Sequence, residues 1–100
     1  MKTVFNLSPI PNQKASFNIK INDKFKLLDL EVRTLSDGEI IVSMYLEGVP
    51  LCLSRRAVNK IPLVLAKKIK GNFYFEDSDK NEDPNYKELG SRFNLIYDEE

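Results

Sequence analysis

Histidine and tryptophan are absent from this 100-residue sequence, and cysteine occurs once. Without histidine the chain lacks the commonest general base, the commonest zinc ligand and the usual partner of a nucleophilic serine or cysteine. A Ser-His-Asp triad and a Cys/His zinc site are therefore excluded. The single Cys52 cannot form an intrachain disulfide, and its neighbours Leu51 and Leu53 favour a small buried or half-buried side chain over a reactive thiol. We expect no catalytic residue, no cofactor and no metal site.

Long apolar runs are also missing. No stretch approaches the roughly 18 apolar residues that suggest a transmembrane helix, and the first ten residues lack the continuous apolar core of a signal peptide. The 15 basic residues balance 15 acidic ones, so net charge gives no bulk attraction to nucleic acid or membranes. A chain of this length supplies one modest core, and we expect a single β domain over residues 1–100. It has little material for the deep cleft in which paired carboxylates could act, so we do not expect an enzyme.

Apolar residues alternate with polar ones in six segments, which is the period of strands that bury one face. Turn-forming sequences such as Ser36-Asp37-Gly38 and Glu47-Gly48 separate these segments. The pattern predicts an all-β fold, a small antiparallel sandwich or barrel with at most one short helix, at Leu63 to Lys70. The doublet Leu27-Leu28 breaks the alternation begun by Phe25 and indicates a β-bulge. The alternating residues are Phe17, Ile19, Ile21, Leu28, Leu30, Val32, Ile40, Val42, Met44, Leu46, Val49, Leu51, Leu53, Phe73, Phe75, Phe93, Leu95 and Tyr97.

An acidic window, D77-S-D-K-N-E-D-P-N-Y-K-E88, has the ligand spacing of an EF-hand calcium loop, with Asp77, Asp79, Asn81 and Glu88 at positions 1, 3, 5 and 12. Its flanks, however, have the pattern of strands rather than helices. Glu82 stands where the loop needs glycine, and Pro84 has no backbone N–H to contribute. We therefore interpret the window as a solvated connection between two strands, with Asp83 to Tyr86 as its turn.

Charge is segregated along the C-terminal half of the chain. Residues 51–75 contain no acidic residue, whereas residues 76–100 contain nine against three basic ones. The segregation could be neutralised within one folded chain, or it could give each subunit a basic side and an acidic side that meet in a ring. For the second case the candidate partner-binding residues are Arg55, Arg56, Lys60, Lys67, Lys68 and Lys70.

Three motifs stand out along the chain: P-N-Q before an alternating strand, L-E-G-V-P-L at 46–51, and G-N-F-Y-F followed by D-P-N-Y-K-E-L-G and a last strand ending near Tyr97. Together they resemble the cyanophage-type baseplate plug family of small phage tail proteins. The first motif is similar to the family's opening, the second to a G-x-P-L turn midway along, and the third to its C-terminal end. The motifs occur in the family's order over nearly the whole chain, although the tryptophan that the family commonly carries is absent. The turn residues that match are Pro11, Asn12, Gly48, Asp83, Pro84, Tyr86, Leu89 and Gly90.

The resemblance implies a non-enzymatic structural part of a contractile tail's baseplate, which caps or plugs the central hub. It implies other baseplate proteins as partners, the tail hub among them, and a possible homotrimer, because such hubs are generally trimeric. The protein would be made in the host cytoplasm and reside in the virion. Two alternatives remain open: an OB-like barrel that binds nucleic acid through the basic segment and stacking on Tyr45, Phe73 or Tyr74, or a generic protein-interaction adaptor. Nucleic acid is the less favoured partner because the nine acidic residues would oppose it.

Overall fold

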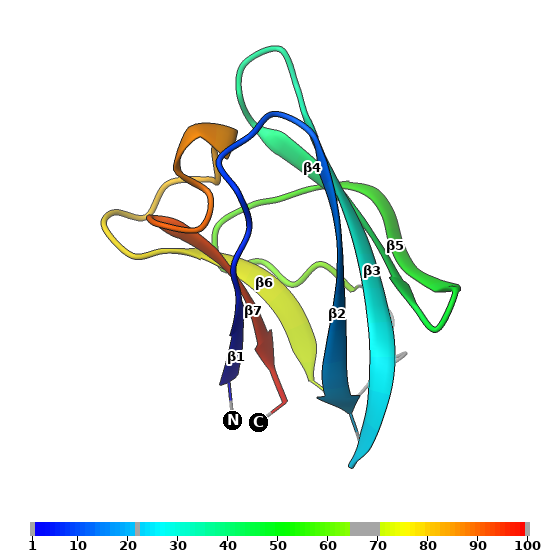
Figure 1. Cartoon of the computed structure of the whole chain (residues 1–100). Coiled ribbons are helices and arrows are strands. Elements are labelled where there is room, and N and C mark those ends of the chain that lie inside the picture. The colour runs from blue at the N-terminus through cyan, green and yellow to red at the C-terminus, as the bar shows by residue number, and fades with distance from the viewer. Residues whose placement is uncertain (1, 22, 65–70, 100) are drawn as a thin grey trace.

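The structure, a computed structural model, describes residues 2–21, 23–64 and 71–99. These residues contain seven strands and one short 3-10 helix. The strands form two antiparallel sheets that face each other (Figure 1). In chain order the elements are β1 (Lys2–Phe5), β2 (Gln13–Ile21), β3 (Lys24–Thr34), β4 (Ile40–Leu46), β5 (Val49–Arg56), β6 (Asn72–Asp77), η1 (Tyr86–Glu88) and β7 (Phe93–Asp98). The prediction of an all-β fold, a small antiparallel sandwich or barrel, is confirmed, and the two sheets form a sandwich.

The two sheets differ in how the chain builds them. The four-stranded sheet has the order β2-β3-β4-β5, a meander in which each strand pairs with its neighbour in sequence. The three-stranded sheet has the order β1-β7-β6, so the last strand lies between the first and the sixth. Within the described ranges, no helix is long and apolar enough to cross a membrane.

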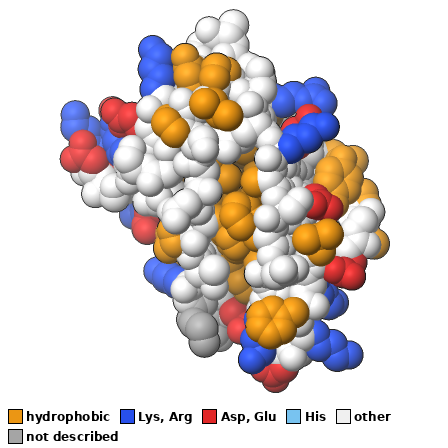
Figure 2. Space-filling model, in the orientation of Figure 1, with side chains coloured by type: hydrophobic (Ala, Val, Ile, Leu, Met, Phe, Trp, Pro, Cys, Tyr) orange, Lys and Arg blue, Asp and Glu red, His pale blue; other side chains and the backbone are white. Residues whose placement is uncertain are grey.

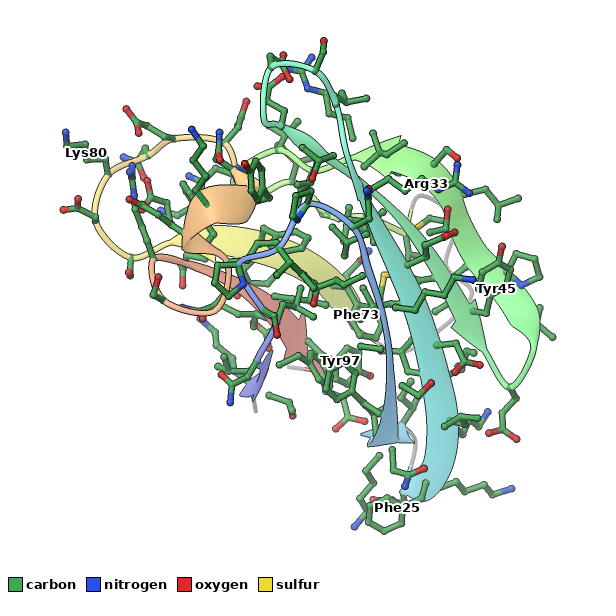
Figure 3. The ribbon with its side chains drawn as sticks, turned by 45° about the horizontal axis from the view of Figure 1, so that its top comes forward. Phe25, Arg33, Tyr45, Phe73, Lys80 and Tyr97 are labelled. Carbon is green, nitrogen blue, oxygen red and sulfur yellow. The ribbon has the colours of Figure 1, made fainter. Side chains whose placement is uncertain are left out.

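The core lies between the sheets and contains most of the residues that alternation predicts. Phe73 and Phe75 of β6 are fully buried, as are Leu28 of β3 and Met44 of β4. Figure 3 shows Phe73 and Tyr97 side by side, with ring centroids 4.8 Å apart. Phe5 of β1 and Phe17 of β2 join the two sheets through rings 4.9 Å apart. Burying a side chain of this size stabilises the fold by about 1.5–3 kcal/mol.

Strand β5 departs from the predicted alternation. Val49 and Leu53 were expected in the core, but they are 62% and 60% exposed, and Leu51 alone of the three is buried. Val49 pairs in register with Leu46 at the end of the hairpin, whereas Leu53 lies in an irregular part of the ladder, where the register of β4 against β5 shifts on both sides of Met44. Ser54 adds a positive φ of 48°. Each irregularity turns the following side chains relative to the sheet, so strict alternation cannot persist along this strand.

The predicted bulge at Leu27-Leu28 is wrong. The pairing of β2 with β3 is unbroken from Gln13↔Val32 to Ile21↔Lys24. Phe25 and Leu27 simply face outward while Leu28 faces the core. The sequence reasoning also missed β1, which is too short to show a period. Of the segment expected as a helix, Leu63 and Val64 are buried and non-helical, and 65–70 lie outside the described residues.

Candidate functional site

Three loops that carry two of the family-like motifs meet at one end of the sandwich, at the top of Figure 1. They are the connections 6–12, 35–39 and 78–92. The Thr34 backbone N–H donates to Asn12 Oδ1 at 3.2 Å, and the Thr34 hydroxyl donates to the carbonyl of Pro11. The Tyr86 N–H donates to the carbonyl of Gly38 at 3.2 Å. These bonds tie each loop to another element, so the three form one continuous surface.

Gly90 fixes how closely two of these loops approach each other. Its φ is +84°, a conformation that residues with a Cβ rarely adopt. A Cβ at this position would lie 2.1 Å from the carbonyl oxygen of Leu7. Both the dihedral and the contact therefore require glycine, and they explain why a glycine closes the D-P-N-Y-K-E-L-G motif.

The rest of that motif packs the turn against the sheet. Asn85 caps η1, accepting the Lys87 N–H on its side-chain oxygen at 3.1 Å. Pro84 and Leu89 are buried, and Tyr86 is half-buried against the core. Asp83 accepts the backbone N–H of Asn59 at 3.0 Å, which attaches the turn to the segment after β5. The motif residues thus hold the loop 78–92 against the sheet.

Gly48 lies away from this cluster, at the hairpin between β4 and β5. Glu47 and Gly48 have φ values of 51° and 81°, the pair of positive dihedrals typical of a tight hairpin turn. Glu47 bonds back to β3, because its N–H donates to the Leu27 carbonyl at 2.8 Å. Nothing lies within 4 Å of a Cβ placed on Gly48. The hairpin is therefore constrained by its dihedrals and remains open to solvent.

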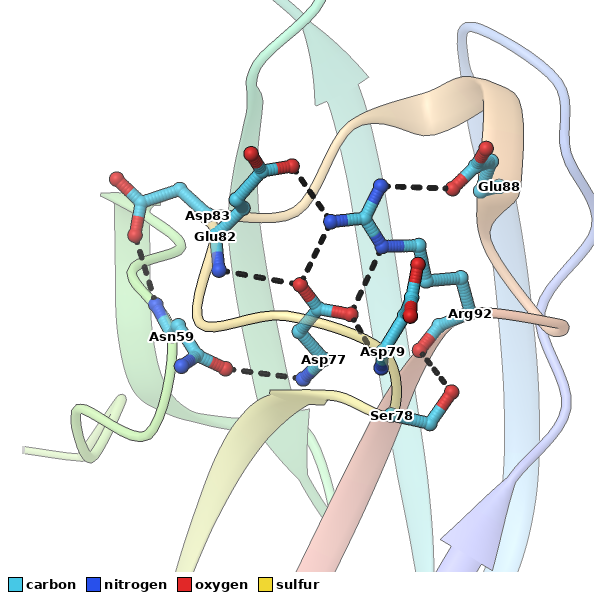
Figure 4. A network of polar contacts seen from close by, with 8 residues as sticks. All are labelled: Asn59, Asp77, Ser78, Asp79, Glu82, Asp83, Glu88 and Arg92. Carbon is cyan, nitrogen blue, oxygen red and sulfur yellow. Dashed lines mark hydrogen bonds and ion pairs between the residues drawn. The ribbon is translucent and has the colours of Figure 1, made fainter.

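The acidic window wraps around an arginine (Figure 4). Arg92 donates from Nε and Nη2 to the two oxygens of Asp77, each at 2.8 Å. The same guanidinium reaches Glu82 at 2.5 Å and Glu88 at 3.2 Å. The Asp77 side chain has no exposed surface, whereas Arg92 retains 20%. The backbone N–H groups of Asp79 and Glu82 complete the shell of Asp77.

This network answers the question raised by the calcium-like spacing. Positions 1 and 12 of the window, Asp77 and Glu88, both bind Arg92, and strands β6 and β7 flank the loop as expected. Hydrogen bonds from Arg92 hold the pKa of Asp77 well below its usual range, and those same bonds raise the pKa of Arg92. The role of Arg92 was missed in the sequence, although its place four residues after Glu88 is a spacing at which opposite charges interact.

A hollow of about 650 Å³ opens beside this network. Acidic side chains dominate its lining, which includes Asp37, Glu39, Asp83 and Glu88 together with Lys87. Within the described ranges, no group of three or more acidic or cysteine side chains is arranged to hold a metal ion.

The predicted basic residues do not form one patch in the described part of the chain. Arg55 pairs in register with the buried Val42 and Arg56 with Ile41, so the two side chains project to opposite faces of β5. Arg56 forms an ion pair with Glu39, and that hydrogen bond raises the pKa of Arg56. Lys60 is exposed beyond the strand. Lys67, Lys68 and Lys70 lie outside the described residues.

The aromatic residues expected to stack on nucleic-acid bases do not form a common platform. Phe73 is fully buried, so it cannot serve. Tyr45 and Tyr74 are half-buried, but they belong to β4 and β6, in different sheets. Their neighbours Met44 and Phe73 face the core, so both tyrosines point away from it, on opposite sides of the sandwich.

Comparison with known proteins agrees with the family resemblance. No curated protein matches the chain. A family model described as cyanophage baseplate Pam3 plug gp18 matches residues 1–100. Because the match covers the whole sequence, the chain belongs to this family of cyanophage baseplate plug proteins.

Proposed function

We propose that the protein is a non-enzymatic structural component of a contractile phage tail, in which it caps or plugs the central hub of the baseplate. The observation that carries the proposal is the match of the baseplate plug family over residues 1–100. The motifs that resemble the family, at both ends of the chain, meet in one cluster of loops. This arrangement supports a role in which the loop cluster binds another protein through its shape.

The loop cluster has the physical properties of a docking surface. Hydrogen bonds from Thr34 and Tyr86, the close approach of Gly90 to Leu7 and the Arg92 network all restrain the loops before any partner binds. A surface that is already ordered loses little conformational entropy on association. We infer that this end of the sandwich contacts another baseplate protein, and we favour the hub.

A trimer follows from the same proposal. A cap on a threefold hub tends to share the symmetry axis of the hub, so three copies would surround it. Head-to-tail contacts between a basic and an acidic side would close such a ring. Arg55, Arg56 and Lys60 are the described candidates for the basic contacts, with Arg55 and Arg56 on opposite faces of β5. Lys67, Lys68 and Lys70 complete the proposed set. The protein would be made in the host cytoplasm and would need no cofactor.

Electron microscopy of tails tests this proposal. Phage that lack the gene should assemble baseplates without density on the axis of the hub, and complementation should restore that density. Threefold density at the hub supports the trimer, whereas density at the baseplate periphery would overturn the capping role while retaining a baseplate protein. Tails that lack the protein altogether would contradict the structural role itself.

A further inference from the structure

The four edges of the two sheets are not equally protected. The segment after β5 covers the edge of β6: the Lys60 N–H donates to the Phe75 carbonyl and the Leu63 N–H to the Phe73 carbonyl, both at 2.8 Å. The edge of β5 contains Pro50 and register shifts, which prevent another strand from pairing. The edge strand β1 has only 4 residues. These are common ways in which proteins blunt exposed edges.

β2 has none of these devices. It is 9 residues long, contains no proline or glycine, and pairs with β3 in continuous register. In the described part of the chain it has no strand on its other side. Every second residue of an antiparallel edge strand directs its N–H and C=O away from its neighbour. β2 therefore presents a regular row of backbone donors and acceptors that match an extended chain.

An apolar seam runs beside this edge. β1 and β2 are the edge strands of different sheets, and they flank the seam between the sheets (Figure 1). Figure 2 shows a band of apolar side chains there in the same orientation. Ala15 and Phe17 of β2 are only partly buried, and the Phe17 ring packs against the Phe5 ring across the seam, tilted by 50°. A strand added to β2 would cover these side chains with its own inward residues.

The charges on β2 favour one kind of incoming strand. Its outward face carries Lys14 and Lys20, both exposed, and no acidic residue. On β3, Asp29 lies opposite Ser16 and accepts its hydroxyl, and Glu31 lies opposite Lys14 and also pairs with Arg33. Antiparallel pairing of two β2 strands centred on Phe17 would place Lys14 opposite Lys20, and like charges directly opposite are destabilising. An incoming strand with acidic residues at alternate positions meets both lysines favourably.

We propose that β2 is a docking edge for an extended acidic segment of another baseplate protein, which adds as a fifth strand to the four-stranded sheet. The proposal rests on the proposed function for the source of the segment. Backbone hydrogen bonds supply affinity in this mode of binding, and alternate side chains supply specificity. Lys14 and Lys20 disfavour pairing with a second copy of the chain and favour pairing with an acidic strand, so they determine the specificity of the edge.

Amide hydrogen exchange on the full chain tests the edge directly. The probe is a peptide of alternating Glu and Val over about nine residues, the length of β2, and the control peptide has Lys in place of Glu. The acidic peptide should slow exchange at every second amide of Gln13–Ile21, and the Lys peptide should not. Equal protection by both peptides, or protection confined to another element, would overturn the proposal.

Two variants separate backbone pairing from charge. Ala15→Lys places a charge on the inward side of the edge, a device that blocks strand addition, and its long stem can reach solvent along the seam. Asn18→Lys places the same charge on the outward side and is the matched control. We expect Ala15→Lys to weaken peptide binding at least about tenfold and Asn18→Lys to retain it. Lys14→Glu combined with Lys20→Glu should reverse the preference between the two peptides with the fold intact.

Other outcomes are decisive as well. If Ala15→Lys unfolds, the lysine reversal still tests the edge, because both positions are exposed. Slow exchange of the β2 edge in the isolated chain, with protection rising with protein concentration, would mean that a second copy covers the edge and would overturn the proposal. In a further outcome, the Ala15→Lys variant enters tails as efficiently as the unmodified chain while deletion of the gene removes the axial density. That result would refute the docking edge and leave the proposed function intact.

Discussion

At the scale of single residues, Arg92 organises the largest polar network of the described chain. One guanidinium contacts Asp77, Glu82 and Glu88, and its plane also lies over the Phe93 ring at 4.8 Å. Among the described residues, Asp77 is the one buried polar or charged residue. A buried carboxylate is tolerated when it is paired and fully hydrogen-bonded, and here both conditions hold.

Asp77→Asn should lower the melting temperature by more than about 5 °C, because it removes the charge that pairs with Arg92 in a solvent-excluded site. Asp79→Asn is the matched control: it lies in the same loop and is exposed, so its melting temperature should change by less than about 4 °C. Thermal unfolding followed by circular dichroism measures both. Equal effects of the two substitutions would show that the Asp77–Arg92 pair contributes no special stability.

The same pair predicts a direction for acid sensitivity. The pKa of Asp77 is lowered in the folded protein, so the unfolded state binds more protons once the pH approaches the ordinary value of about 3.9. The stability contributed by Asp77 is therefore fully present above that value and is lost as the pH falls towards the folded-state pKa. Urea unfolding between pH 6 and pH 2 should show this loss, and the Asp77→Asn variant should show a smaller dependence over the same interval.

At the scale of elements, alternation predicted β2, β3, β4, β6 and β7 because regular strands with one buried face repeat every two residues. It failed where backbone geometry is irregular. In β5 the exposed Leu53 lies among the register shifts, and no residue pattern predicts such a shift. The partner of Asp77 could not be inferred either, because it depends on how the loop folds back onto β7.

Two glycines in turns give a controlled test of the loop cluster. Gly48→Ala introduces a Cβ into open space at φ +81°, so it should cost about 1–2 kcal/mol from the dihedral alone. Gly90→Ala has nearly the same φ but also collides with the Leu7 carbonyl, so the loop must move and the cost should be larger. Urea denaturation compares the two. A cost for Gly90→Ala no greater than that for Gly48→Ala would mean that the loops separate without penalty.

At the scale of the whole molecule, the proposed contact between a basic and an acidic side predicts an assembly that is sensitive to salt. If a basic and an acidic side meet between subunits, association should weaken as the salt concentration rises from about 0.05 to 0.5 M, because screening shortens the reach of exposed charges. Light scattering across that range measures the effect. Assembly that is indifferent to salt would instead indicate an apolar interface.

Charge reversal locates the basic side. Arg55→Glu combined with Arg56→Glu should abolish incorporation into tails, while Arg33→Glu, an exposed reversal on β3 outside the basic segment, should not. Because Arg56 pairs with Glu39, the double variant should also melt at a slightly lower temperature. If it unfolds outright, the arginines serve to neutralise acidic residues within their own chain, and the contact between subunits must lie elsewhere.

The order of strands in the three-stranded sheet also determines how the chain can fold. Residues 13–56 can build the meander from local hairpins as soon as they leave the ribosome. β1, however, pairs only with β7 among the described strands, from Lys2↔Asp98 to Phe5↔Leu95, so it must wait for the last part of the chain to be made. Closing so long a loop is entropically costly and slow. Until then Phe73 lacks the neighbouring rings of Phe5 and Tyr97, so we expect truncated or stalled chains to aggregate rather than fold.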